Sequence, residues 1–136
     1  MARFGSLAGE PALAGRLNLH AIGPTRRMLQ RGTLGEALTR IPAGAPGYLT
    51  IDLDVLSPEA IGGAVSTPVA NGLTWDELFE IVEYAMARLD VVACDLVEFH
   101  PDAAIPGQWT SQLSTLILLL IEGLAAGAHR RDGLAT

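Results

Sequence analysis

Two aspartates lie two residues apart at the end of an apolar run, in the stretch YLTIDLDVLSP at residues 48–58. If this run is a β-strand, Asp52 and Asp54 point to the same side, because side chains alternate along a strand. Two like charges a few ångströms apart repel each other, so either one carboxyl is protonated or a cation lies between them. Two hard oxygen ligands suit magnesium or manganese. The pair is therefore a candidate metal site, and the alternative is two solvated aspartates at the end of a strand.

The elements that must position this pair alternate between strands and helices. Strand-like segments lie at residues 17–23, 48–54 and 91–99, and helical patterns at residues 33–41, 74–90 and 110–126. The clearest helix begins at Thr74, which forms a capping-box pattern with Glu77. Leu73 and Leu78 occupy the two positions of a hydrophobic staple beside it. The start of this helix is thus specified by local sequence alone.

This alternation predicts an α/β fold with a parallel sheet and helices on both faces. The strand at 91–99 is apolar enough to be buried on both faces. In such sheets, ligands bind at the carboxyl ends of the strands. Asp95 and Glu98 lie at one such end, as Asp52 and Asp54 do at another. The sequence therefore predicts a cluster of acidic residues at one edge of the sheet.

Length and composition restrict the class of protein. The chain of 136 residues suits one domain, with residues 1–16 as a loose lead-in and residues 17–136 as the domain. Its net charge is −6 and it has no lysine, so a nucleic-acid partner is not expected. A single cysteine, Cys94, cannot form an internal disulfide and is typical of the cytoplasm. The most apolar run, at 116–121, is too short to span a bilayer, and the first residues do not resemble a signal peptide.

An acidic pair after an apolar strand is found in haloacid-dehalogenase phosphatases and in ureohydrolases. The phosphatase fold needs a lysine to balance its phosphoaspartate, and the absence of lysine argues against it.

Three segments, in the same order and spacing, resemble motifs of the ureohydrolase (arginase/agmatinase) superfamily. TIDLDVLSP (50–58) is similar to S-x-D-x-D-x-x-D-P, and AVSTPVANGLTWDE (64–77) is similar to G-[TV]-[GS]-x-P-x-x-G-G-L-[ST]-x-x-E. VVACDLVEFHP (91–101) is similar to D-[LIV]-[VM]-E-[VFL]-x-P. The resemblance covers roughly residues 17–126 and implies the C-terminal part of a three-layer α/β/α arginase-like fold.

The resemblance implies hydrolysis of a guanidino or amidine group by water that a pair of Mn²⁺ ions activates. By match, Asp52 and Asp54 are metal ligands and Glu98 faces the guanidinium group of a small substrate, since a carboxylate suits that planar cation. The alternative for Glu98 is a salt bridge to an arginine of this chain. Glu77 is expected to serve its helix, and Asp95 to be a structural hydrogen-bond acceptor. No catalytic residue is assigned.

The sequence also departs from the family pattern. The G-G-D-H and D-A-H-x-D motifs, which supply the other metal ligands, do not occur, and none of the three histidines lies in such a context. The chain therefore supplies two of six expected ligands. Ser57 replaces the aspartate before Pro58, the segment IGGAVS is one residue longer, and Asn71 replaces the first glycine of G-G-L. These changes fall in the expected substrate loop.

Three interpretations of function follow. The first is a ureohydrolase-like protein that provides part of a dimanganese site and is inactive alone. The second is a non-catalytic interaction or remnant protein that keeps the arginase-like fold, and the third is a truncation. Strands without their usual neighbours expose apolar edges, which favour association. The expected partners are further copies of the chain or a separate N-terminal-half subunit.

Overall fold

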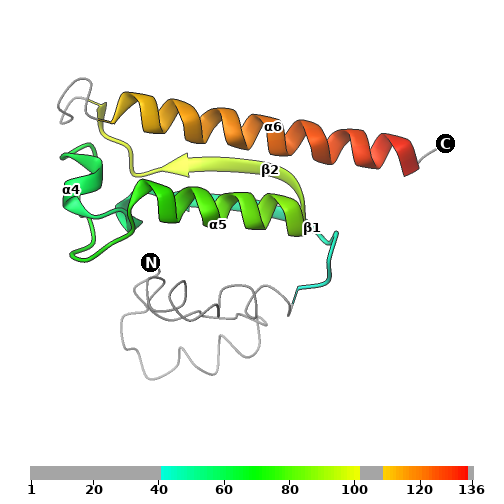
Figure 1. Ribbon diagram of the computed structural model, residues 1–136, viewed down its shortest axis with the longest axis horizontal. Coiled ribbons are helices and arrows are strands. Elements are labelled where there is room, and N and C mark those ends of the chain that lie inside the picture. The colour runs from blue at the N-terminus through cyan, green and yellow to red at the C-terminus, as the bar shows by residue number, and fades with distance from the viewer. Residues whose placement is uncertain (1–40, 102–108, 135–136) are drawn as a thin grey trace.

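The computed structural model describes residues 41–101 and 109–134, where two parallel strands pack against two long helices (Figure 1). In chain order the elements are β1 (Pro46–Asp52), the 3₁₀ turn η1 (Leu53–Val55), α4 (Pro58–Ile61), α5 (Trp75–Arg88), β2 (Asp90–Val97) and α6 (Thr110–Leu134). The strand predicted at 17–23, the helix at 33–41 and the domain boundary after residue 16 lie outside the described residues and stay predictions.

The strands β1 and β2 form a parallel pair connected through α5. The register places Thr50 opposite Asp95, and Asp52 opposite Val97. An irregularity between Gly47 and Tyr48 shifts the pairing by one residue near the start of both strands. Because residues of matching parity then share a face, the register fixes which side chains of the two strands lie together.

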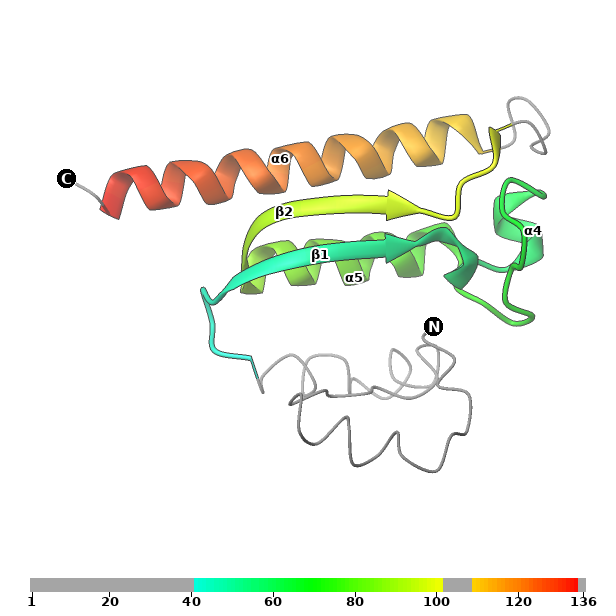
Figure 2. The same cartoon turned by 180° about the vertical axis from the view of Figure 1, so that it is seen from behind.

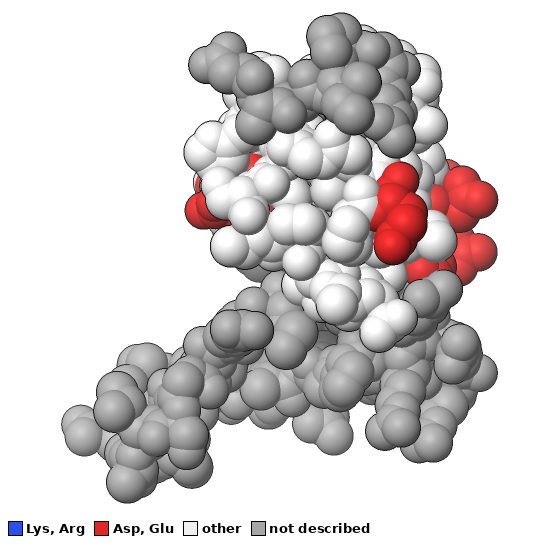
Figure 3. Space-filling model, turned by 90° about the vertical axis from the view of Figure 1, so that its left-hand side faces the viewer, with Lys and Arg blue, Asp and Glu red and all other residues white. Residues whose placement is uncertain are grey.

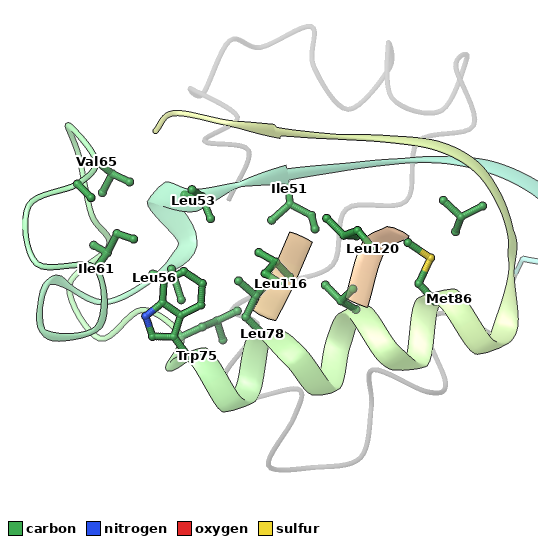
Figure 4. Close-up of a cluster of buried hydrophobic side chains, with 14 residues drawn as sticks. Ile51, Leu53, Leu56, Ile61, Val65, Trp75, Leu78, Met86, Leu116 and Leu120 are labelled. Atoms are coloured by element: carbon green, nitrogen blue, oxygen red, sulfur yellow. The ribbon is translucent and has the colours of Figure 1, made fainter. Parts of the chain in front are cut away.

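The two faces of this sheet have different surroundings. The covered face carries Leu49, Ile51, Cys94 and Leu96, which pack in the core. Figure 4 shows Ile51 pointing toward Leu116 and Leu120 of α6 and Leu78 of α5. We call the opposite side the open face; it carries Tyr48, Thr50, Asp52, Ala93, Asp95 and Val97. Seen from behind, β1 stands in front of α5, and β2 runs between β1 and α6 (Figure 2).

The helix α5 begins where its local signals place it. The hydroxyl of Thr74 accepts from the backbone N–H of Glu77, and the carboxylate of Glu77 accepts from the N–H of Thr74 at 2.8 Å. Both leucines of the staple are buried. The indole N–H of Trp75 donates to the carbonyl of Ala60 at 2.8 Å, which binds the start of α5 to α4. The predicted capping box is confirmed.

Gly72 and Asn71 explain the turn that leads into α5. A Cβ on Gly72 would lie 2.6 Å from the carbonyl oxygen of Val55, so no larger residue fits without moving backbone. Asn71 has φ of 58°, in the left-handed region that asparagine tolerates better than most residues. Replacement of the first glycine of the motif by Asn71 is therefore compatible with the same backbone.

The helix α6 packs its buried residues against both α5 and β2. Leu116 is fully buried, and a Cβ on Gly123 would meet the side chain of Met86 at 2.7 Å, so the two helices approach closely there. Among the described residues, α6 is the one helix long and apolar enough to cross a membrane. Only 17% of its most apolar stretch is buried, although Leu116 and Leu120 belong to the hydrophobic core.

Several predicted boundaries are wrong. The first described strand ends at Asp52 instead of residue 54, because the chain turns into η1. The second strand, predicted to be buried on both faces, leaves Val92 49% and Val97 37% exposed. The loop expected from Ser57 to Gly72 contains α4, which Ser57 caps, and the last helix continues to Leu134 instead of 126. The α/β class with a parallel sheet and packed helices is confirmed.

Candidate metal and substrate site

Asp52 and Asp54 lie at the carboxyl end of β1 but on different elements. Asp52 is the last residue of β1, and Asp54 lies in η1. Oδ1 of Asp52 accepts a hydrogen bond of 2.9 Å from the backbone N–H of Asp54, which caps the 3₁₀ turn. Both side chains are half-buried. The expectation that strand alternation alone orients the pair is wrong, since the cap of η1 sets their relative position.

Thr67 holds Asp54 from the loop between α4 and α5. The backbone N–H of Thr67 donates to Oδ1 of Asp54 at 3.3 Å, and the hydroxyl of Thr67 donates to Oδ2. The N–H of Val69 donates to the carbonyl of Asp54 at 3.0 Å. These bonds fasten the loop to the end of β1. Sequence reasoning gave Thr67 no role, although its place in the STP segment of the second motif was an available signal.

Glu98 directly follows β2 and lies beside the end of β1, because Asp52 and Val97 are register partners. Its backbone φ is 65°, a left-handed conformation that costs a non-glycine residue about 1–3 kcal/mol. Its side chain is exposed, and the described residues form no ion pair with it. A salt bridge from Glu98 to one of the described arginines is therefore not found.

The described cations lie at the opposite end of the sheet. Arg131 forms an ion pair with Asp90, the first residue of β2, and Arg88 donates to the carbonyl of Ile41 at 3.1 Å. Figure 3 views the molecule from the end at which α4 lies and shows acidic side chains on either side of an uncharged area. The carboxyl edge therefore carries uncompensated negative charge from the described residues, which suits a cationic ligand.

Asp95 lies on the open face, two residues before the end of β2. It accepts a hydrogen bond of 2.8 Å from the hydroxyl of Tyr48, which confirms its expected role as an acceptor. The hydroxyls of Thr50 and then Tyr48 lower the pKa of Asp95, and the hydrogen bond to Asp95 is the main cause that raises the pKa of Tyr48. Oδ1 of Asp95 is shielded from solvent, and among the described residues no donor reaches it with full hydrogen-bond geometry.

Cys94 and His100 lie in surroundings that indicate structural roles. Cys94 faces the core, where desolvation and then the charge of Asp95 raise the pKa of its thiol, as expected for an inert filler. The side chain of His100 is exposed, and its backbone N–H donates to the carbonyl of Ala64 at 2.8 Å. That bond brings the segment after Glu98 next to the loop after α4.

The donor chemistry of the edge fits part of a metal site. Within the described residues, no group of three or more His, Cys, Asp and Glu side chains is placed to hold one metal ion. Asp52 and Asp54 offer hard carboxylate oxygens, and an oxygen that accepts one hydrogen bond keeps a further lone pair for a metal. The two aspartates therefore suit manganese or magnesium but do not complete a ligand set.

Comparison with known proteins places this geometry in a family. The model of the arginase family matches residues 13–121. N(1)-aminopropylagmatine ureohydrolase from Thermus thermophilus is 28% identical over 113 residues, which cover 82% of this chain and 38% of that protein. Agmatinase from Bacillus cereus is 45% identical over 69 residues, which cover 50% of this chain and 23% of that protein. The chain thus spans well under half the length of these curated relatives.

Solved structures show the same relationship. A hypothetical agmatinase from Burkholderia thailandensis superposes with a TM-score of 0.62 at 26% identity, over 80% of this chain and 34% of that one. Formimidoylglutamase from Bacillus subtilis has a TM-score of 0.69 at 21% identity, over 90% of this chain and 39% of that one, and supports the fold alone. The chain belongs to the arginase family, and its described residues form part of the arginase-like α/β fold.

Proposed function

We propose that this chain supplies Asp52 and Asp54 to a dimanganese site, and Glu98 to the adjoining subsite for a guanidino or amidine group, in a ureohydrolase. One observation carries the proposal: the ends of two paired strands bring all three carboxylates to the same edge of the sheet. The left-handed backbone of Glu98 supports it, because such strain in a non-glycine residue is concentrated at functional sites.

Each residue has a distinct role in this proposal. A bound pair of manganese ions supplies hydroxide at neutral pH by lowering the pKa of a bound water. Asp52 and Asp54 hold the metals, while Thr67 orients Asp54 through its two hydrogen bonds. Glu98 accepts two N–H groups of the planar substrate cation, which orients the carbon to be attacked.

The site also needs residues from elsewhere. The G-G-D-H and D-A-H-x-D motifs are not in the 136 residues, and the relatives contain far more sequence than this chain matches. We propose that a separate N-terminal-half subunit or further copies of the chain complete the site, in the cytoplasm, and that the isolated chain has little or no hydrolase activity. The exposed side chains of Ile117, Leu118 and Ile121 on α6 offer an apolar surface for such association.

The metal content of the isolated chain tests its incompleteness. After manganese loading and desalting, we expect much less than one manganese per chain and no urea or ammonia from agmatine or arginine, because two carboxylates alone bind Mn²⁺ weakly. Light scattering of the same sample reports its oligomeric state. Retention of nearly two manganese per chain, lost in Asp52→Asn or Asp54→Asn, would show that self-assembly completes the site.

A chimera tests the roles of the three carboxylates. In the chimera, residues of this chain replace the matching segment of Bacillus cereus agmatinase. Its manganese content and its hydrolysis of agmatine are then measured. We expect Asp52→Asn and Asp54→Asn to lose manganese, and Glu98→Gln to keep manganese while kcat/KM falls about 100-fold or more, since each lost charged contact costs a few kcal/mol.

The exposed helical variant Glu83→Gln is the matched control and leaves both readouts unchanged. Loss of manganese in Glu98→Gln would contradict its placement at the substrate. A folded chimera that binds no manganese and has no activity would favour the second interpretation, in which the chain is a non-catalytic interaction or remnant protein.

A further inference from the structure

The backbone of Glu98 is held in a conformation that glutamate rarely adopts. Among the described residues, Asn71 and Glu98 are the non-glycine residues with positive φ, at 58° and 65°. Asparagine tolerates the left-handed region, whereas a glutamate there is strained. Such strain persists only where the surrounding structure imposes it. Because the side chain of Glu98 is exposed, the residues next to it in the chain must impose this conformation.

Fixed points lie on both sides of Glu98. On one side, Val97 ends β2 and is still paired with β1. On the other side, the backbone N–H of His100 donates to the carbonyl of Ala64 at 2.8 Å, and Ala64 is fully buried. Only two residues therefore connect the sheet with the loop after α4. A change of direction over so few residues commonly needs one residue with positive φ.

The ring of Phe99 supplies a third constraint. It packs edge-on against the indole of Trp109, with ring centroids 4.8 Å apart and ring planes at 72°. Trp109 directly precedes α6, and its carbonyl accepts from the N–H of Leu113 at 2.9 Å, which ties it to the first turn of that helix. Both rings also pack against the hydrophobic core. Because Phe99 follows Glu98 directly, its fixed ring limits rotation of the peptide that joins them.

We propose that Phe99 and the backbone N–H of His100 constrain Glu98 to the left-handed conformation and are positioning residues for its carboxylate. The constraint is a property of the chain alone. Its use, which is to present Glu98 in one direction to the planar cation of a substrate, rests on the proposed function. A carboxylate that is held in place before binding loses less freedom when the cation binds, which favours both affinity and orientation.

Glycine and alanine at position 98 test the constraint in the intact chain. In ordinary backbone, alanine is more favourable than glycine, because glycine loses more conformational freedom on folding. At a constrained φ of 65° we expect the reverse order, since glycine adopts this conformation without strain. Urea unfolding should therefore give a higher midpoint for Glu98→Gly than for Glu98→Ala. Alanine at least as stable as glycine would overturn the proposal, and neither variant alters the packing of Phe99.

Removal of the Phe99 ring tests its part in the constraint. We expect Phe99→Ala to abolish the advantage of glycine over alanine at position 98. The Cα and Cβ chemical shifts of Glu98 should also move toward those of ordinary backbone. Phe79→Ala is the matched control, because Phe79 is another partly buried ring that packs against a tryptophan, and it leaves both readouts unchanged. A glycine advantage that survives Phe99→Ala would exclude Phe99 and contradict the proposal.

Hydrogen exchange tests the backbone N–H of His100 in the same NMR spectra. If its bond to Ala64 forms in solution, this N–H should exchange at least about tenfold more slowly than an unprotected amide. His100→Ala keeps the N–H and should leave the glycine advantage at position 98 unchanged. Exchange at the unprotected rate would show that this anchor is absent, which contradicts the proposal.

The chimera with Bacillus cereus agmatinase separates this constraint from the proposed function. We expect Phe99→Ala to lower kcat/KM for agmatine about tenfold or more with manganese retained, and to change it less than about twofold when combined with Glu98→Gln. Losses of equal size in both backgrounds would show that Phe99 does not act through Glu98, which contradicts its positioning role. A glycine advantage in the intact chain together with unchanged hydrolysis in Glu98→Gln would confirm the constraint and contradict the proposed function of Glu98.

Discussion

The two faces of the β1–β2 pair share one backbone and one register but differ in every other respect. The covered face presents aliphatic side chains to two helices, and Ile51 there is only 6% exposed. The open face presents Tyr48, Thr50 and Asp95, which interact with each other, and none of the described helices packs against them. Residues directly next to each other in sequence therefore have unlike environments, since successive side chains point to opposite faces.

This difference separates stability from chemistry in the molecule. Burial of the covered face against α5 and α6 holds the strands in place and supplies most of their stability. The carboxylates of the candidate site lie where the strands end, and the loop carrying Thr67 fixes one of them. The open face contributes Asp52 to the site at the end of β1 but no packed core, and none of the described helices covers it.

Neighbouring valines of β2 give the largest test of this comparison. Val91 is 3% exposed and Val92 is 49% exposed. Val91→Ala should lower the free energy of unfolding by about 2 kcal/mol, because it removes buried methyl groups worth about 0.8 kcal/mol each and leaves a cavity. Val92→Ala should change it by less than about 0.5 kcal/mol. Urea unfolding of the three chains measures the difference.

Equal losses for both valines would break the comparison, because they would show that Val92 is also packed in solution. That outcome would place a covering group over Val92, which lies at the irregularity of the register and has no partner in β1. The pair is well matched because both changes remove the same atoms from the same strand.

Features encoded within a few residues were predictable from the sequence. The start of α5 depends on the capping box between Thr74 and Glu77, which are only three residues apart. The parallel sheet followed from alternating patterns, and the family followed from three ordered motifs. These are local or strongly repeated signals, which survive differences in tertiary context.

Features set by contacts between distant segments were not predictable. β1 ends at Asp52 because that side chain caps η1, and an apolar pattern that continues past the aspartate gives no sign of it. The bonds from Thr67 to Asp54 join residues 13 apart. Val92 is exposed at the irregularity of the register, where it has no partner in β1, and the apolar composition of β2 alone suggested burial on both faces.

The hydrogen bond between Tyr48 and Asp95 gives the smallest effect and tests whether the polar groups of the open face contribute to stability. Because folding lowers the pKa of Asp95, its contribution is present above the ordinary aspartate pKa of about 4 and is lost as pH falls through the lowered value. Because folding raises the pKa of Tyr48, its contribution is present below the ordinary tyrosine pKa of about 10 and is lost as pH rises through the raised value. The stability difference between the wild type and Tyr48→Phe should therefore be constant between about pH 5 and pH 9 and shrink on both sides.

Urea unfolding across this range measures it, with Tyr84→Phe as the control. A difference that stays constant into strong acid and base would show that the hydroxyl of Tyr48 acts without the carboxylate of Asp95. The hydrogen bond between these two polar groups would then contribute nothing to stability.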